Sequence, residues 1–233
     1  MIAALLFDLD GTLIDSMPLH HDAWVAWHAR RGLAMDTEHF FESTAGRSNA
    51  EILLDMFPAL SIAEHVEMAD HKEALYREFA AVSLGLIPGA KAFAEEARAA
   101  GCKLAVCTAS TPPNMALAFA QHGIDGWFDT ITSPADVSSG PGPAAPLRGK
   151  PHPDIFIEAA HRLGIAPEHC LVFEDAPLGV EAARRAGMKA VALTTTLPAE
   201  AFAAFDNIIA IAPDFTTLDL PALLLAVQPK ATT

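Results

Sequence analysis

The sequence predicts an α/β fold in which a doubly wound parallel sheet carries an inserted helical domain. Short apolar segments alternate with helical segments along most of the chain, which is the rhythm of parallel strands connected by helices. The block from residue 16 to residue 84 breaks this rhythm, because it has helical periodicity and little strand signal. We therefore expect an α/β core from residues 1–15 and 85–233, and a helical domain from residues 16–84.

The expected strands are short apolar runs that end at polar residues, and the expected helices lie between them. We place the strands at residues 2–7, 103–107, 130–132, 170–173, 190–193 and 208–211, and the helices at residues 90–100, 113–122, 153–163 and 178–186. Ligands of parallel sheets bind outside the carboxyl ends of the strands. Polar side chains directly after the strands are therefore the first candidates for function.

In the block 16–84, apolar residues recur at helical spacing, for example Leu19, Ala23 and Trp27. Trp24 and Trp27 are expected to pack in the core of this domain rather than to stack on a ligand. The spacing thus predicts a bundle of helices inserted after the first strand.

Three further segments are set apart by their composition. The chain is expected to return to the α/β core near residues 86–89. The Gly/Pro-rich residues 138–149 favour neither helix nor central strand, and we interpret them as a surface loop, with a flap beside the active site as the alternative. The tail, residues 228–233, is expected to fray.

The composition disfavours several classes of protein. Lys and Arg total 15 against 29 for Asp and Glu, and a formal net charge of −14 disfavours binding to nucleic acid. No apolar run reaches the roughly 20 residues of a membrane-spanning helix, and the N-terminus is typical of a first strand rather than a signal peptide. Cys102, Cys107 and Cys170 lie among apolar residues without the spacing of metal ligands. We expect a cytoplasmic monomer with buried, reduced thiols and no nucleic-acid or membrane partner.

Two aspartates, Asp8 and Asp10, follow the first apolar run. Alternate side chains of an extended strand point the same way, so both carboxylates can face the point where the strand ends. Such a pair repels unless a cation or a shared proton lies between the two groups. Gly11 permits a sharp turn, and the backbone N–H groups of such a turn can bind an anion. The segment therefore offers a nucleophile, an acid or base, a metal site and a phosphate cradle.

This segment, read from Asp8 to Ser16, resembles the first motif of the haloacid dehalogenase superfamily. Thr108 closes an apolar run as the hydroxyl residue of the second motif does, Lys150 resembles the third motif, and the pair Glu174-Asp175 resembles the fourth. The four motifs occur in the order of the family. The chain is therefore identified as a member, closest to the branch of β-phosphoglucomutase and phosphoglycolate phosphatase, and the resemblance implies a Rossmann-like core with a helical cap.

The resemblance also implies the chemistry. Asp8 is the expected nucleophile, which forms an aspartyl phosphate, and Asp10 is the expected general acid and then general base. Mg²⁺ suits a hard, carboxylate-rich site. Its implied ligands are an Asp8 oxygen, the Asp10 backbone carbonyl and Asp175, with Glu174 behind them to orient a bound water or to support Lys150; a simple ion-pair role for Glu174 is the alternative.

The remaining motif residues are assigned to the phosphoryl group and the substrate. Thr108 is expected to donate a hydrogen bond to a phosphoryl oxygen, and Lys150 to neutralise charge there. Ala109 and Ser110, which follow Thr108, are assigned to the substrate site. Specificity is assigned to five residues of the helical domain, namely His20, Gly46, Arg47, Ser48 and Asn49. An ordinary helix histidine remains the alternative for His20, and a solvated arginine the alternative for Arg47.

The sequence departs from the mutase pattern in the helical domain. The mutase carries a lysine before the cap glycine and an arginine three residues after it, where this chain has Ala45 and Asn49. Dehalogenation is disfavoured because the dehalogenating relatives lack an aspartate at the position of Asp10. Phosphonatase-like chemistry needs a lysine near the start of the cap, and no lysine precedes Lys72.

The function expected from these observations is a Mg²⁺-dependent phosphatase of small phosphomonoesters such as sugar phosphates. A β-phosphoglucomutase-type isomerase is the first alternative, and a non-catalytic phosphate-binding regulator is the second.

Overall fold

The computed structural model describes residues 4–44, 47–140 and 144–227. Its centre is a sheet of six parallel strands in the order β5-β4-β1-β6-β7-β8. The strands are β1 (Ala4–Phe7), β4 (Lys103–Cys107), β5 (Thr130–Thr132), β6 (Cys170–Glu174), β7 (Lys189–Leu193) and β8 (Ile208–Ala212). The predicted parallel sheet is confirmed. Residues 2 and 3 of the expected first strand and the tail 228–233 lie outside the described residues.

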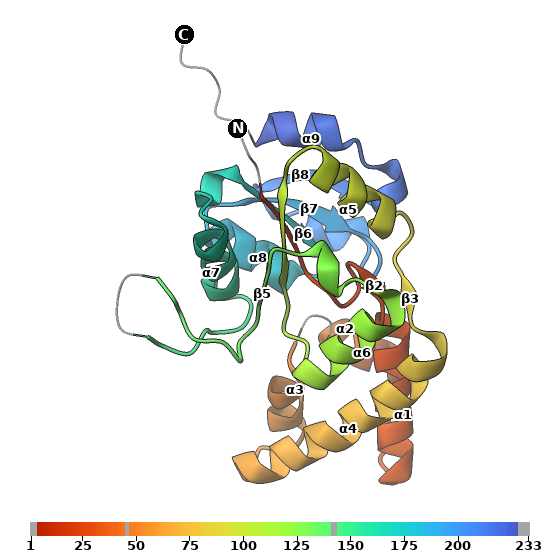
Figure 1. Ribbon diagram of the computed structural model, residues 1–233. Coiled ribbons are helices and arrows are strands. Elements are labelled where there is room, and N and C mark those ends of the chain that lie inside the picture. The colour runs from red at the N-terminus through yellow and green to blue at the C-terminus, as the bar shows by residue number, and fades with distance from the viewer. Residues whose placement is uncertain (1–3, 45–46, 141–143, 228–233) are drawn as a thin grey trace.

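Helices cover both faces of the sheet (Figure 1). Leu5 and Phe7 of β1 pack on one face and Ala4 and Leu6 on the other, because successive side chains of a strand point to opposite faces. The first face is covered by α5 (Ala90–Ala99), α6 (Pro112–His122) and α9 (Leu220–Ala226), and the second by α7 (Asp154–Leu163) and α8 (Pro177–Arg185). Short 3₁₀ turns span Asp125–Trp127, Pro167–His169, Ala199–Phe202 and Phe215–Thr217. The predicted doubly wound α/β fold is thus confirmed.

Four helices form the segment between β1 and the rest of the sheet. They are α1 (Met17–Arg30), α2 (Thr37–Thr44), α3 (Asn49–Met56) and α4 (Ile62–Ser83), and they gather at one end of the sheet in Figure 1. Trp24 and Trp27 are buried, with ring centroids 5.3 Å apart in an edge-to-face arrangement. The prediction that this tryptophan pair packs in a core is confirmed. The division of the chain at residues 15/16 and 84/85 remains a prediction.

A second, two-stranded sheet joins the start and the end of this helical segment. Its strands β2 (Ile14–Asp15) and β3 (Gly85–Leu86) are antiparallel, with Ile14 opposite Leu86. The backbone N–H of Ile87 extends the pairing by donating to the Leu13 carbonyl at 3.0 Å. Strands of two residues are too short to show alternation, so the sequence analysis missed them. The pairing brings both connections of the helical segment to one place beside the carboxyl end of β1.

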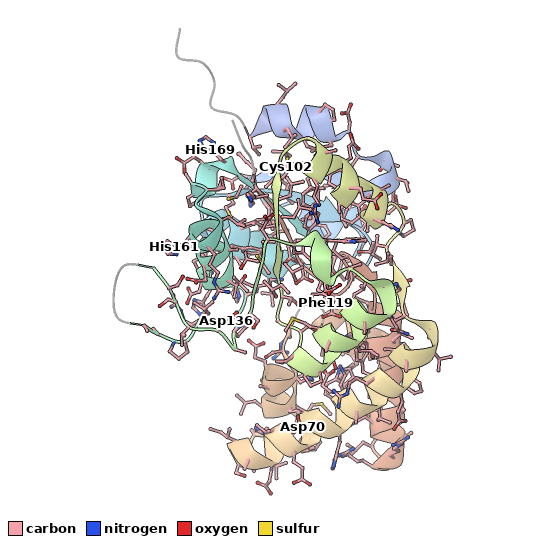
Figure 2. All side chains as sticks on the ribbon, in the orientation of Figure 1. Asp70, Cys102, Phe119, Asp136, His161 and His169 are labelled. Carbon is pink, nitrogen blue, oxygen red and sulfur yellow. The ribbon has the colours of Figure 1, made fainter. Side chains whose placement is uncertain are left out.

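The described residues of the Gly/Pro-rich segment, 138–140 and 144–149, belong to an arm that extends to the side of the sheet, away from α1 and α4 (Figure 1). Val137 and Pro146 form an antiparallel bridge at its base, and Ser139 donates a hydrogen bond of 2.5 Å to the buried Glu158 of α7. In Figure 2, Asp136 and His161 lie close to this base. Residues 141–143 of the arm lie outside the described residues. The anchored base and the outward direction agree with a surface loop.

Two expectations from composition concern the whole chain. In the three described ranges, no helix combines the length and the apolar character that a membrane crossing requires. Cys102, Cys107 and Cys170 are buried and form no disulfide, as their apolar surroundings predict.

Candidate active site

Three predicted residues meet at the carboxyl edge of the sheet. Asp8 follows β1, Thr108 follows β4 and Asp175 follows β6, and these strands are neighbours in the sheet. The pairing continues one residue beyond the strands, since the backbone N–H of Asp8 donates to the Phe173 carbonyl at 3.0 Å and that of Thr108 to the Thr132 carbonyl at 3.0 Å. The backbone of these residues is therefore fixed by the sheet, and their side chains are buried.

Lys150 reaches this cluster from the segment before α7. Its Nζ forms an ion pair with Asp8 Oδ1 and lies 2.5 Å from Glu174 Oε1. Burial by itself lowers the pKa of Lys150, but the charges of Asp8 and Glu174 outweigh it and raise that pKa. Lys150 is therefore a fixed positive charge between two carboxylates, and it lies beside the nucleophile that the sequence predicts.

Asp8, Glu174 and Asp175 form a compact group of carboxylates. One oxygen of each lies within 4.8 Å of the others, and all three residues are buried. Burial and the charge of Asp8 raise the pKa of Asp175 to about 7, and burial raises the pKa of Glu174 to about 8 despite the charge of Lys150. Burial also raises the pKa of Asp8, although Lys150 opposes this. Close, buried carboxylates ionise with difficulty unless a positive charge lies between them. This group of carboxylates is therefore suited to bind a divalent cation that prefers oxygen ligands.

The orientation of Asp175 is set by hydroxyl groups from two loops. Thr12 donates to Oδ1 at 3.2 Å, and Thr196, from the loop after β7, donates to Oδ2. Gly11 has φ = +76°, and a Cβ at this position would overlap Asp175 Oδ2. The glycine predicted for its sharp turn therefore also allows the Asp175 carboxylate to lie against the backbone of the turn.

Glu174 lies beneath the first turn of α8 for a similar reason. A Cβ on Gly179 would overlap the Glu174 carboxylate. The absence of a side chain at Gly179 lets Glu174 lie close to the α8 backbone while it pairs with Lys150.

The Asp10 carboxylate points toward the start of α1. Ser16 donates a hydrogen bond of 2.7 Å to Asp10 Oδ1, and His20 Nε2 lies 3.5 Å from the same oxygen. Burial raises the pKa of Asp10, but hydrogen bonds from His20, Ser16 and Ser110 outweigh burial and lower the pKa to about 2. His20, which the sequence analysis assigns to specificity, therefore lies beside the predicted acid–base residue.

His20 is held by two residues of α4 that the sequence analysis did not select. Its ring stacks on Tyr76 at 3.9 Å between centroids, and its Nδ1 lies 2.6 Å from Lys72 Nζ. Because the Lys72 ammonium can only donate, His20 Nδ1 accepts and Nε2 carries the proton toward Asp10. Lys72, Tyr76 and Ala80 share one face of α4 at four-residue spacing, which is the signal that could have identified Lys72.

Lys72 belongs to a buried ion pair. Its Nζ donates to Glu73 Oε1 at 3.0 Å, and both residues are buried. Glu73 also accepts hydrogen bonds of 2.5 Å from Asn49 at the start of α3 and from Asn114 of α6. Burial raises the pKa of Glu73, but Lys72 and the two amides outweigh it and lower that pKa to about 2. A charged carboxylate thus connects α3 and α4 to α6.

The predicted specificity segment has other contacts than a substrate. Arg47 lies 2.5 Å from Asp55 Oδ2 and donates to the Glu51 carbonyl at 3.2 Å. Ser48 is the N-cap of α3, where it forms a capping box with Glu51. Asn49 donates to Glu73, as described above. Ala45 and Gly46, the other predicted positions of this segment, lie outside the described residues.

The two predicted residues after Thr108 are more accessible than Thr108 itself. Ala109 is exposed and Ser110 is half-buried. The backbone N–H of Ser110 donates to Thr108 Oγ1 at 2.9 Å. This contact uses a lone pair of the hydroxyl group and leaves the Thr108 proton free to donate elsewhere.

A cavity of about 380 Å³ lies between the start of α1, the start of α2 and the loop after β7. It is lined by Met17, Pro18, His21, Thr37, Phe41, Thr195 and Thr196. None of Asp8, Asp10 and Lys150 lines this cavity, so it is separate from the carboxylate cluster. Thr196 connects the two, because its hydroxyl group donates to Asp175.

A doubly wound sheet with a buried carboxylate and lysine cluster at its carboxyl edge defines an α/β enzyme. The family model of haloacid dehalogenase-like hydrolases matches residues 2–187. The chain therefore belongs to the haloacid dehalogenase-like hydrolase family, and the predicted resemblance is confirmed.

Proteins of known name share most of the chain. Hexitol phosphatase A of Escherichia coli is 33% identical over 202 residues, which are 81% of each chain. Validoxylamine A 7′-phosphate phosphatase of Streptomyces hygroscopicus is 34% identical over 209 residues, 88% of this chain and 92% of that protein. The crystal structure of β-phosphoglucomutase from Clostridium difficile has a TM-score of 0.78 at 25% identity and covers 97% of both chains. Phosphatases and a mutase are thus both similar to this chain.

Proposed function

We propose that this protein is a Mg²⁺-dependent phosphatase that hydrolyses small phosphomonoesters, such as sugar phosphates, through an aspartyl-phosphate intermediate. The observation that carries the proposal is the position of Asp8, which pairs with Lys150 and shares a carboxylate cluster with Glu174 and Asp175. The names of the two phosphatases at 33% and 34% identity support the reaction class.

Two steps would complete the reaction. In the first, an Asp8 oxygen attacks phosphorus, the ester O–P bond breaks, and the departing alkoxide takes a proton from Asp10. In the second, Asp10 takes a proton from water, and the water oxygen attacks the phosphorus of the aspartyl phosphate. Asp8 and inorganic phosphate are released, so that one water is consumed for each ester cleaved.

The groups around Asp8 would stabilise the charge of the transferring phosphoryl group. Lys150 supplies a fixed positive charge, and Thr108 supplies a hydroxyl proton that its contact with Ser110 leaves available. Bound Mg²⁺ would neutralise phosphoryl charge. It would be held by Asp8, Asp175 and the Asp10 carbonyl, with Glu174 behind them.

The protonation of Asp10 depends on the substrate in this proposal. With a pKa of about 2, Asp10 is ionised before substrate binds and is ready to act as a base. A general acid needs a proton, and a phosphomonoester with a second pKa near 6 can bring one. The negative phosphoryl group raises the pKa of Asp10, because like charges disfavour ionisation. The hydrogen bond from His20 favours the ionised form of Asp10 that the second step requires.

We propose that residues 16–84 form a cap over the site and that the cap favours hydrolysis over mutase chemistry. A mutase has to hold the second phosphate of a bisphosphate. Ala45 and Asn49 stand where the mutase has a lysine and an arginine, so two cationic contacts to a distal phosphate are missing. Arg47 pairs with Asp55 and Asn49 donates to Glu73, so each of these side chains already has a protein partner that competes with a distal phosphate. A charge-assisted hydrogen bond contributes about 1.5–3 kcal/mol, and two missing ones correspond to a factor of about a hundred or more in binding the distal group.

A non-catalytic phosphate-binding regulator explains the site less well. Such a protein needs no nucleophile, yet Asp8 is buried beside Lys150, and Asp10 lies close by with His20 against it. The complete set of reactive groups supports an enzyme.

The proposal is tested by incubating the purified protein and Mg²⁺ with a panel of phosphorylated metabolites and measuring free phosphate. Phosphate release from small sugar phosphates is expected. For the mutase alternative, β-glucose 1-phosphate is supplied with catalytic glucose 1,6-bisphosphate, and glucose 6-phosphate and phosphate are followed together. Glucose 6-phosphate that forms much faster than phosphate would establish the mutase instead.

A further inference from the structure

The loop after β7 contacts the carboxylate cluster through two consecutive threonines. Thr196 Oγ1 donates to Asp175 Oδ2, and Thr195 Oγ1 donates to the Gly11 carbonyl at 2.5 Å. Both contacts join residues far apart in the sequence. No motif of the sequence analysis includes this loop, and it lies 46 residues beyond Lys150.

Both carboxylate oxygens of Asp175 accept a hydrogen bond. Thr12 donates to Oδ1 at 3.2 Å, while Thr196 donates to Oδ2 from the opposite loop. Gly11 has no Cβ, and this leaves the space that Oδ2 occupies. A carboxylate oxygen has two lone pairs, so each hydrogen-bonded oxygen can still act as a metal ligand.

We infer that Thr196 is a positioning residue, which holds Asp175 in the orientation that binds a divalent cation together with Asp8. The inference deepens the proposed function and rests on it. Groups that hydrogen-bond to metal ligands fix the ligand geometry, and their removal lowers metal affinity by about 10–100-fold. Without the Thr196 hydroxyl group, Asp175 can turn about its last torsion, and the cation loses a pre-oriented ligand.

The test uses the full chain and compares Thr196→Val with Thr196→Ser. Valine keeps the shape of threonine and removes the hydroxyl group, whereas serine keeps the hydroxyl group. Thr194→Val is the matched control, because the Thr194 hydroxyl group donates to the Ala212 carbonyl at 3.5 Å and has no hydrogen bond to the carboxylate cluster within the described part of the chain. Mg²⁺ and Mn²⁺ binding to the metal-free proteins is measured by isothermal titration calorimetry, and the melting temperature is measured with and without Mg²⁺.

The Kd for each cation is expected to rise about 10–100-fold in Thr196→Val and to stay within about threefold of the wild type in Thr196→Ser and Thr194→Val. The metal-free melting temperature of Thr196→Val is expected to stay close to that of the wild type, while its increase on addition of Mg²⁺ shrinks. At saturating Mg²⁺ the activity of Thr196→Val is expected to recover, because the defect lies in metal affinity.

Unchanged Kd values in Thr196→Val, in a wild type that binds Mg²⁺ and releases phosphate, would overturn this inference alone. An equal loss of affinity in Thr196→Ser would overturn it too, since the hydroxyl group would then not be the cause. A wild type that binds no divalent cation or releases no phosphate from any ester would overturn the proposed function instead.

Discussion

The buried ion pair of Lys72 and Glu73 gives a sharp prediction for stability. In Glu73→Gln the side chain keeps its size and loses its charge, so Lys72, only 2% exposed, loses its anionic partner and keeps only the hydrogen bond to His20. Burial already lowers the pKa of Lys72, and Glu73 opposes that shift, so the ammonium form becomes more costly to bury in this variant. The amides of Asn49 and Asn114, each 2.5 Å from a Glu73 oxygen, then lose a charged acceptor as well. Removal of one partner from a buried pair costs about 3–5 kcal/mol. For a chain of this size, where 1 kcal/mol shifts the midpoint by about 2–4 °C, the melting temperature is expected to fall by about 6–20 °C.

Thermal and urea unfolding followed by circular dichroism measure this change. Glu78→Gln is the matched control on the same helix, because Glu78 is exposed and lies 3.8 Å from Arg30, and its loss is expected to cost less than about 1 kcal/mol. The double variant Lys72→Met/Glu73→Gln removes both charges and is expected to be more stable than Glu73→Gln. A Glu73→Gln protein within 1 kcal/mol of the control, or a double variant less stable than the single one, would refute the reasoning.

Three further predictions concern the reactive cluster. Asp8→Asn is expected to fold normally and to lose several orders of magnitude in kcat, measured as phosphate release; near-normal turnover contradicts the nucleophile assignment. Gly179→Ala is expected to displace Glu174, weaken its pairing with Lys150 and lower both the melting temperature and kcat, whereas a wild-type profile would show that α8 can yield at this point. Folding raises the pKa of Glu174 to about 8 and that of Asp175 to about 7, so both carboxyl groups release their protons at lower pH in the unfolded chain than in the folded one. The folded, metal-free protein is therefore expected to lose stability as the pH rises from about 4 to about 8. Chelation is expected to abolish activity, and the melting-temperature increase on adding Mg²⁺ is expected to be larger at pH 8 than at pH 5; an equal increase at both values argues against these carboxylates as ligands.

The sheet could be predicted from the sequence because its strands carry strong local signals. β4 and β6 are continuous apolar runs, and their observed bounds differ from the expected ones by at most one residue. The proximity of Asp8, Thr108 and Asp175 could be predicted because the carboxyl ends of parallel strands lie at the same edge of the sheet. A strand of two residues is too short to show alternation of apolar and polar side chains, so the two-stranded sheet of β2 and β3 was missed.

The contacts of the site were less predictable than its members. Nothing local in the sequence indicates that Glu73 bonds to both Asn49 and Asn114, since these contacts depend on how α3, α4 and α6 pack. Thr195 and Thr196 were missed because hydroxyl residues after a strand are common and carry no distinctive spacing. A motif identifies the groups that react, whereas the groups that orient them depend on tertiary packing.

The two-stranded sheet of β2 and β3 has a consequence for how this chain can change in evolution. Paired strands lie about 4.8 Å apart, so the first and last residues of the helical segment leave the sheet side by side. The helical segment therefore begins and ends at two adjacent points, and its length and sequence do not change the distance between those points. A different helical insert with the same two ends could replace it without moving β1, β4 or β6. Substrate preference could then change when the whole helical segment is exchanged, while the residues at the carboxyl edge of the sheet stay the same.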